Sequence, residues 1–111
     1  MIIRKASKKD IFLLKQIWIK SKYAQTSDKK MDKALKRSLR YSETYIVEEK
    51  NKPIAYFVIE NKKGITYLAY VAIIKSEQGK GFGTKIMTKI ILLAKKSKSK
   101  NKLIIIFFKI F

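Results

Sequence analysis

Three of the chain's four glycines lie within five residues, and this cluster constrains the fold more than any other feature of the sequence. Gly79, Gly81 and Gly83 follow a strand-like apolar segment, Ile65 to Ile74, and precede helical apolar spacing that begins at Phe82. Glycine costs conformational entropy, and the start of a helix does not require three of them. The pattern therefore predicts a strand-to-helix turn whose backbone comes close to a ligand.

The ligand expected at such a turn is an anion. The first four N–H groups of a helix have no intrahelical partner, and the helix dipole favours negative charge there. A phosphate or pyrophosphate is the natural occupant, and Lys80 and Lys85 add positive charge. The glycine spacing matches neither the dinucleotide fingerprint G-x-G-x-x-G nor the P-loop.

The rest of the chain predicts a single α+β (α/β) domain over residues 1–111, with element order β-α-α-β-β-β-α-β and a mixed, mainly antiparallel sheet flanked by helices. Ser7 and Asp10 resemble a capping box at the start of the first helix. The other expected elements are a strand at Met1–Ala6, a helix at Lys29–Tyr41, strands at Thr44–Glu49, Ile54–Glu60 and Ile65–Ile74, a helix from Phe82, a loop at Lys95–Lys102 and a buried strand at Leu103–Phe111.

The turn fits the pattern [Q/R]-x-x-G-x-[G/A], and this resembles the acyl-coenzyme A-binding segment of the GNAT N-acetyltransferase superfamily. The opening residues Ile2 to Ala6, the pair Asp10-Ile11 and the element order are also similar to that family. The resemblance implies a GNAT-like acyl-CoA N-acyltransferase fold and direct transfer of an acetyl group from acetyl-CoA to an amine.

The resemblance also implies roles for individual residues. Val71 and Ile73 would offer backbone groups to the pantetheine arm of coenzyme A, and strand N–H groups would polarise the thioester carbonyl. Backbone N–H groups would wrap the pyrophosphate at Gln78, Gly79, Lys80, Gly81, Phe82, Gly83 and Thr84.

The sequence departs from the family pattern at the expected general base. Many members carry a carboxylate in the fourth strand, and this chain has none between Gly64 and Lys75. Tyr67 occupies the position where that carboxylate often occurs, Tyr70 follows it, and Glu60 is the nearest carboxylate. A phenol is a poor base at neutral pH, so Glu60 is the preferred candidate. Taken singly, each of the three fits an ordinary strand position better than a catalytic role.

A second departure concerns the C-terminal part of the fold. The family fold continues after its fifth strand, so the resemblance implies a fold truncated at that strand. An apolar edge strand at Leu103–Phe111 would then invite pairing with another chain. We therefore expect a homodimer formed through this strand, or a degenerate family member.

Composition limits the chemistry and leaves other functions open. The chain has no cysteine and no histidine, which excludes thiolate nucleophiles, Ser-His pairs and the usual zinc ligands, and no metal is expected. The charge of +19 is scattered over every segment, typical of a solvated lysine surface.

Neither a signal peptide nor a membrane span is recognisable, so a cytoplasmic protein is expected. The alternatives are an inactive module that binds coenzyme A or a polyanion, and a small basic nucleic-acid-binding protein. The acceptor cannot be identified from the sequence.

Overall fold

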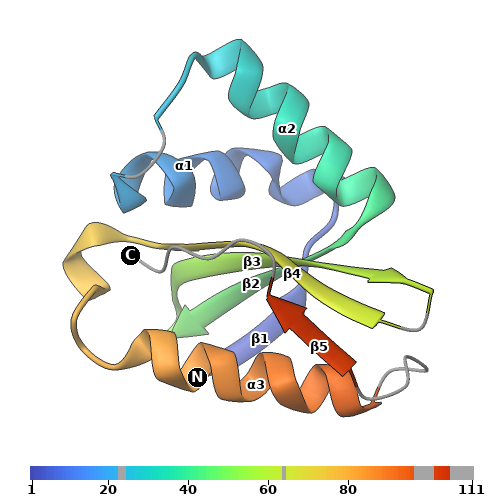
Figure 1. Cartoon of the computed structure of the whole chain (residues 1–111). Helices are drawn as coiled ribbons and strands as arrows, with labels where there is room; N and C mark the ends of the chain where they lie inside the picture. Colours follow the sequence, from blue (N-terminus) through green and yellow to red (C-terminus); the bar gives the residue numbers. More distant parts are fainter. Residues whose placement is uncertain (23–24, 64, 97–101, 106–111) are drawn as a thin grey trace.

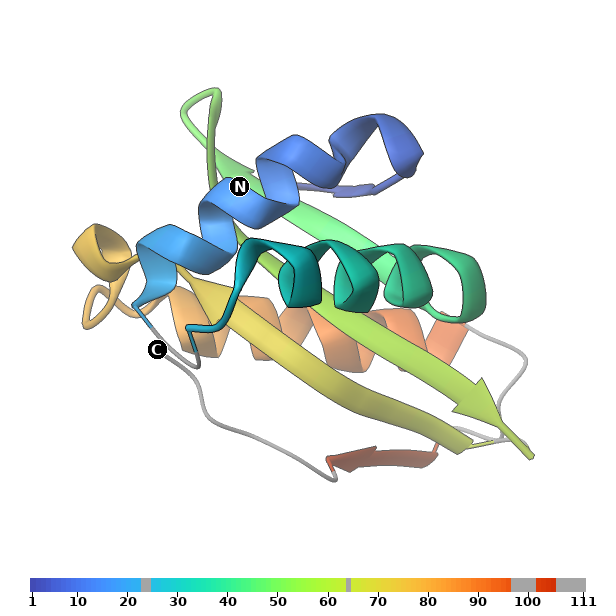
Figure 2. The ribbon, with the colours of Figure 1, turned by 90° about the horizontal axis from the view of Figure 1, so that it is seen from above.

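The computed structural model describes residues 1–22, 25–63, 65–96 and 102–105 as one mixed sheet with helices on both faces (Figure 1). Helices α1 and α2 cover one face, and α3 covers the other (Figures 1 and 2). The strands are β1 (Ile2–Lys5), β2 (Glu43–Glu49), β3 (Lys52–Lys62), β4 (Ile65–Ile73) and β5 (Lys102–Ile105). The helices are α1 (Ile11–Ser21), α2 (Asp28–Tyr41) and α3 (Phe82–Lys96), with short 3-10 turns η1 (Lys8–Asp10) and η2 (Lys75–Glu77).

The sheet follows chain order, β1-β2-β3-β4-β5. The first four strands are antiparallel, and β5 pairs with β4 in parallel after the crossover through α3. The turn between β2 and β3 places Lys50 and Asn51 at positive φ, 50° and 64°, the geometry of a tight hairpin turn. The predicted fold class and element order are confirmed.

Each face of the sheet has its own apolar core. On the α3 side, Phe57 and Leu68 from the sheet pack with Ile86 and Ile90 from the helix. The spacing of four between the two helical residues is the one the sequence predicts, and both are fully buried. On the opposite side, the buried residues Leu14, Ile17, Leu35, Tyr56 and Val58 join α1 and α2 to the sheet.

The first helix begins later than the capping pattern predicts. Asp10 accepts a hydrogen bond from the Ser7 N–H at 2.9 Å, as expected, but the chain makes the 3-10 turn η1 before α1 begins at Ile11. Both Asp10 carboxylate oxygens also accept from the Arg4 guanidinium, at 3.0 and 3.2 Å. This contact fastens the start of α1 to β1 and lowers the pKa of the Asp10 carboxyl.

Strand β4 is irregular near its middle. Val58 pairs with Tyr70 and Ile59 pairs with Leu68, so Ala69 is an extra residue that forms a β-bulge. The described ladder between β4 and β5 ends at the pair Leu68 and Ile105. The predicted C-terminal strand is therefore observed over Lys102–Ile105, and its remainder, residues 106–111, lies outside the described residues.

Candidate functional site

The glycine-rich loop joins the end of β4 to the start of α3. Gly79 and Gly81 have φ angles of +79° and +83°, which disfavour any residue with a side chain. A β-carbon built on either glycine meets no atom within 4 Å. The two glycines are therefore required by their backbone conformation, and close packing against neighbouring elements does not explain them.

The open space beside the loop is lined by unused hydrogen-bond donors. The hydrogen bonds of the described residues include none donated by the backbone N–H groups of residues 79–84. The first helical bond across the junction runs from the Lys85 N–H to the Gly81 carbonyl at 3.3 Å. Together with the dipole of the 15-residue helix α3, these N–H groups form an arrangement that suits a phosphate group.

The side chain of Gln78 holds this loop in place. Its amide nitrogen donates to the Ile73 carbonyl at the end of β4, at 2.8 Å, and to the Ser21 carbonyl at the end of α1, at 3.1 Å. Sequence reasoning assigned Gln78 only a backbone role at the pyrophosphate. In the structure the Gln78 N–H donates instead to the Lys75 carbonyl, at 3.2 Å, and the contribution of Gln78 is the brace formed by its side chain.

The edge of β4 opposite β3 leads from the loop toward the bulge. Ile74 donates its N–H to the Ile54 carbonyl on β3, at 2.9 Å. Because successive strand residues point to opposite edges, the backbone groups of Ile73 and Val71 point away from β3. Neither residue faces a partner strand within the described part of the β4–β5 ladder. These are the two residues expected to contact the pantetheine arm.

A basic hollow of about 430 Å³ lies on the hairpin side of the loop. Its lining residues are Glu49, Lys50, Lys52, Ile54, Glu77, Lys80, Phe82 and Lys85. Lys80 pairs with Glu77 at 3.3 Å, and the Lys85 ammonium lies 5.5 Å from the centre of the Phe82 ring. The four lysines outnumber the two carboxylates, so this wall of the loop is positively charged.

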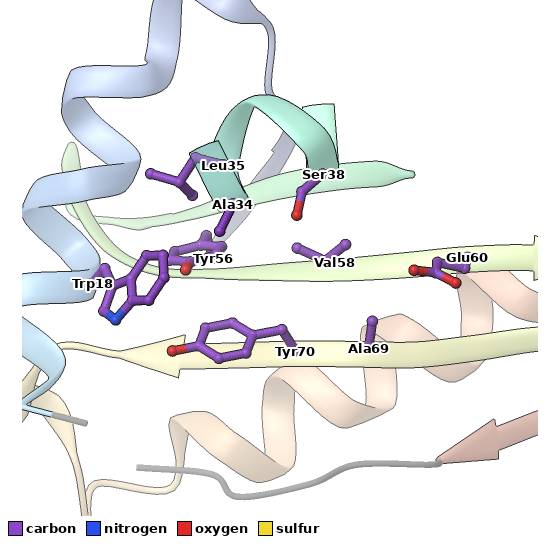
Figure 3. A pocket seen from close by; sticks show the side chains of 9 residues that line it. All are labelled: Trp18, Ala34, Leu35, Ser38, Tyr56, Val58, Glu60, Ala69 and Tyr70. Atoms are coloured by element: carbon purple, nitrogen blue, oxygen red, sulfur yellow. The ribbon is translucent and has the colours of Figure 1, made fainter. Parts of the chain in front are cut away.

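A second cavity, of about 220 Å³, lies between α1, α2 and strands β3 and β4 (Figure 3). It is lined by Trp18, Ala34, Leu35, Ser38, Tyr56, Val58, Glu60, Ala69 and Tyr70. Aromatic rings enclose one end of this cavity, and the Glu60 carboxylate lies at the other (Figure 3).

The aromatic end is a stack of rings. The Tyr70 ring lies 5.5 Å from that of Tyr56 and 6.0 Å from that of Trp18, measured between centroids. Burial, with a smaller contribution from Tyr70, raises the pKa of Tyr56 far above its ordinary value. Tyr56 therefore stays protonated at neutral pH and cannot act as a base.

The structure brings the three candidate catalytic residues onto one face of the sheet. Glu60 and Tyr70 both line the cavity. Tyr67 pairs directly with Glu60 across the two strands but does not line it. The Glu60 carboxylate accepts a hydrogen bond from Ser42 Oγ at 3.3 Å and lies 3.1 Å from the Lys62 ammonium. An ammonium group can thus approach this carboxylate.

Several residues of the cavity escaped the sequence analysis. The sequence predicts no functional role for Trp18, Tyr56 or Ser38. The aromatic cluster becomes visible only when the register places Tyr56 and Tyr70 on the same face. In the sequence alone, the one sign of this aromatic cluster is a tyrosine in each of two neighbouring strands.

The described residues contain neither a metal-binding cluster nor a membrane-spanning helix. They contain no cluster of acidic side chains that could hold a metal ion. No helix within residues 1–22, 25–63, 65–96 and 102–105 is long and apolar enough to cross a membrane.

Comparison of the sequence with known families gives one match. The model of the acetyltransferase (GNAT) family matches residues 11–107, which include the glycine-rich loop and all the strands except β1. A comparison with curated proteins gave no match.

Solved structures with the same fold are similar at low sequence identity. A Pyrococcus horikoshii protein assigned as an acetyltransferase superposes with a TM-score of 0.75 at 18% identity, covering 86% of this chain and 35% of that chain. The ribosomal-protein-S18-alanine N-acetyltransferase from Escherichia coli gives a TM-score of 0.73 at 14% identity, covering 86% and 59%.

A further similar structure was solved with the acyl donor bound. This GNAT family acetyltransferase from Brucella melitensis, in complex with acetyl-CoA, gives a TM-score of 0.72 at 17% identity, covering 97% and 76%. The chain thus spans 35% and 59% of the first two proteins and three quarters of the third. These similarities concern the fold.

Proposed function

The chain belongs to the acetyltransferase (GNAT) family, and from this premise we propose that it transfers an acetyl group from acetyl-CoA to an amine. The observation that carries the proposal is the loop from Gly79 to Thr84, with unused N–H groups beside open space at the start of α3. A loop that served only for packing would have no reason to keep that space open.

The donor would lie along the edge of β4 opposite β3. Its pyrophosphate would accept hydrogen bonds from the N–H groups of residues 79–84, where the dipole of α3 and the charge of Lys80 and Lys85 favour it. Its pantetheine arm would pair with the outward backbone groups of Val71 and Ile73. From Ile73 to Tyr70 the strand spans about 10 Å, which carries the thioester toward the bulge at Ala69.

The bulge and the cavity would then supply the chemistry. The acceptor nitrogen attacks the thioester carbonyl, forming a C–N bond while the C–S bond breaks. Glu60 would accept the proton that the amine loses, and an outward N–H of β4 near the bulge would stabilise the developing oxyanion. The proton finally reaches the coenzyme A thiolate through solvent or through a phenol such as Tyr70.

The same features weigh against the two alternatives. A purely basic nucleic-acid-binding surface has no need of a carboxylate in an aromatic cavity, and Glu60 would repel phosphate groups. A module that only binds coenzyme A would not need a second cavity on the opposite face of the sheet. Both alternatives remain outcomes of the experiment below.

The experiment combines a melting curve with mass spectrometry. Acetyl-CoA should raise the melting temperature, because a ligand at 100 times its dissociation constant adds about 2.7 kcal/mol of stability. The protein is incubated with acetyl-CoA and a panel of amines and then desalted. Mass spectrometry should detect acetylated acceptor and free coenzyme A. A melting shift without product would identify a binding module. No shift with acetyl-CoA, but a large one with an oligonucleotide, would contradict the proposal.

A further inference from the structure

Helix α2 carries an unusual excess of uncompensated positive charge. Its two acidic side chains, Asp28 and Asp32, both pair with Lys15 of α1. Its cations are Lys29, Lys30, Lys33, Lys36, Arg37 and Arg40. Among the residues that the structure describes, none of these six forms an ion pair, although the Arg40 guanidinium lies over the Tyr41 ring at 5.2 Å. The cations are available to an external anion.

Some of these cations border a groove that leads to the candidate base. One hollow, of about 250 Å³, is lined by Lys30, Lys33, Ala34 and Arg37. A larger hollow, of about 550 Å³, is lined by Arg37, Ser38, Tyr41, Ser42, Glu60 and Lys62. The two share Arg37, and each shares residues with the aromatic cavity: Ala34 for the first, Ser38 and Glu60 for the second. We call these two hollows together the α2 groove.

The charges along the α2 groove have a fixed order. Lys30, Lys33 and Arg37 lie along one stripe of the helix, and the Glu60 carboxylate follows at the end beside the cavity. From Lys30 to Arg37 the helix rises by about 10 Å, the length of roughly three extended residues. A ligand that matches this order carries an ammonium group at one end and several negative charges behind it.

Resting on the proposed acetyl transfer, we propose that the acceptor is the amino group of an acidic polypeptide segment bound in the α2 groove. The acceptor amine displaces the exposed Lys62 ammonium from Glu60, and the carboxylates that follow pair with Arg37, Lys33 and Lys30. A small amino acid is too short to reach all three cations. A nucleic acid has no aliphatic amine for the Glu60 carboxylate to receive.

The helix itself supplies a matched pair of variants. Lys30→Glu with Arg37→Glu reverses two charges that line the groove. Lys29→Glu with Lys36→Glu makes the same charge change with the same spacing of seven, on a stripe rotated by about 100°. Neither Lys29 nor Lys36 lines the aromatic cavity or either hollow of the α2 groove. Any general effect of net charge on anion binding will therefore appear in both variants.

The first measurement is direct binding, which does not depend on catalysis. A fluorescent peptide with a blocked amino terminus and four acidic residues is titrated by anisotropy at physiological salt. Lys30→Glu/Arg37→Glu should weaken binding about tenfold or more, a loss of at least 1.4 kcal/mol. Lys29→Glu/Lys36→Glu should change it less than threefold. Equal losses in the two variants would overturn the proposal.

The second measurement is turnover with acetyl-CoA. Peptides with a free amino terminus followed by acidic, neutral or basic residues are compared by kcat/KM, and the acidic peptide should be preferred at least tenfold. The groove variant should abolish this preference, so that within that variant the acidic and neutral peptides have kcat/KM values within threefold of each other. No preference for the acidic peptide would refute the proposal while leaving acetyl transfer intact.

Two further outcomes separate the alternatives. If no peptide is acetylated but the acidic peptide still binds in a groove-dependent way, the proposed function fails and the acidic docking surface stands. If a single-stranded oligonucleotide binds tighter than the acidic peptide and depends on the same two residues, the groove is a nucleic-acid surface and the proposal is wrong.

Discussion

At the level of single residues, the glycines of the loop act through backbone conformation. Gly79 and Gly81 adopt positive φ angles beside open space, so a side chain there would be strained without colliding with the protein. The effect of backbone strain and the effect of a new negative charge can therefore be separated by comparing two substituted side chains of nearly the same shape.

Gly81→Asp should abolish acetyl-CoA binding, because the carboxylate would occupy the phosphate position beside unused N–H groups. Gly81→Asn is the matched control, since asparagine has nearly the same shape and tolerates the left-handed conformation. Both variants should lose about 1–2 kcal/mol of stability, measured by urea denaturation. Calorimetry should detect acetyl-CoA binding only to the asparagine variant. Equal affinities in the two variants would show that the loop does not hold the phosphates.

Glu60→Gln should lower kcat by about 10²–10⁴-fold if this carboxylate accepts the proton of the amine. Tyr67→Phe and Tyr70→Phe should each reduce the rate by less than tenfold, because a phenol is a poor base at neutral pH. Glu48→Gln, which removes a carboxylate that pairs with Arg4, is the control and should retain full activity. A Glu60→Gln rate within tenfold of the wild type would assign the proton to another group.

The pair Arg4–Asp10 predicts how stability changes with pH. The hydrogen bond from Arg4 lowers the pKa of Asp10 below its ordinary value of 3.8. A lowered folded-state pKa stabilises the fold above the unfolded-state value, and this stability is lost as pH falls through the lowered value. Asp10→Asn should therefore cost about 0.5–1 kcal/mol at pH 6, since Arg4 is partly exposed. The difference should shrink toward zero near pH 2–3, as followed by urea denaturation. A constant difference across that range would exclude the pair as the cause.

At the level of elements, the hydrophobic period predicts most of what is observed. The β-branched and aromatic runs of β2, β3 and β4, bounded by turn residues, locate these strands within two residues, and α3 begins at the predicted Phe82. The positive φ angles of Lys50 and Asn51 match the expected hairpin turn. Local chemistry specifies these features, so a single sequence is sufficient to find them.

The sites that depend on contacts distant in sequence could not be predicted. The bulge at Ala69 arises from the register between β3 and β4, which no local pattern reveals. The Gln78 side chain reaches Ser21, a residue 57 positions away. The pairing of Glu60 with the aromatic cavity likewise requires α2 to be placed over the sheet. Sequence analysis named Glu60, but the structure supplies the surroundings that favour it.

The brace between the loop and α1 gives a prediction at this scale. Gln78→Glu replaces a donor by an acceptor that faces the carbonyls of Ser21 and Ile73, which should cost about 1–3 kcal/mol. The loop should loosen, so acetyl-CoA affinity should fall along with the melting temperature. Gln25→Glu, which removes an exposed amide contact to the Trp18 carbonyl, is the matched control and should leave binding unchanged. Full affinity in Gln78→Glu below its melting temperature would exclude the brace.

At the level of the whole molecule, the sheet separates two tasks. The loop and the basic hollow lie at the C-terminal end of β4 and the start of α3, while the aromatic cavity and the α2 groove lie on the opposite face. Strand β3 lines both regions, with Lys52 and Ile54 in the basic hollow and Tyr56, Val58 and Glu60 in the aromatic cavity. Strand β4 lines the cavity through Tyr70 and runs on through Val71–Ile73 to the glycine-rich loop. Under the proposed function, donor and acceptor would meet at the edge of β4, where Tyr70 of the cavity precedes Val71.

The outer edge of β5 gives the last prediction, a homodimer formed through the C-terminal strand. Within the described residues β5 is the last strand of the sheet and pairs only with β4. In the sequence an apolar run, Leu103 to Phe108, begins within β5 and extends beyond it. An apolar edge strand without a partner favours pairing with another chain. The charge of +19 opposes association, but exposed charges are screened within about 8 Å at 0.15 M salt.

Sedimentation should therefore show a monomer–dimer equilibrium that shifts toward the dimer as salt rises. Phe108→Lys should give a monomer, whereas Ile2→Lys, on the exposed edge strand β1 at the other side of the sheet, should not. A wild-type monomer at high salt would mean that the apolar run is covered within one chain.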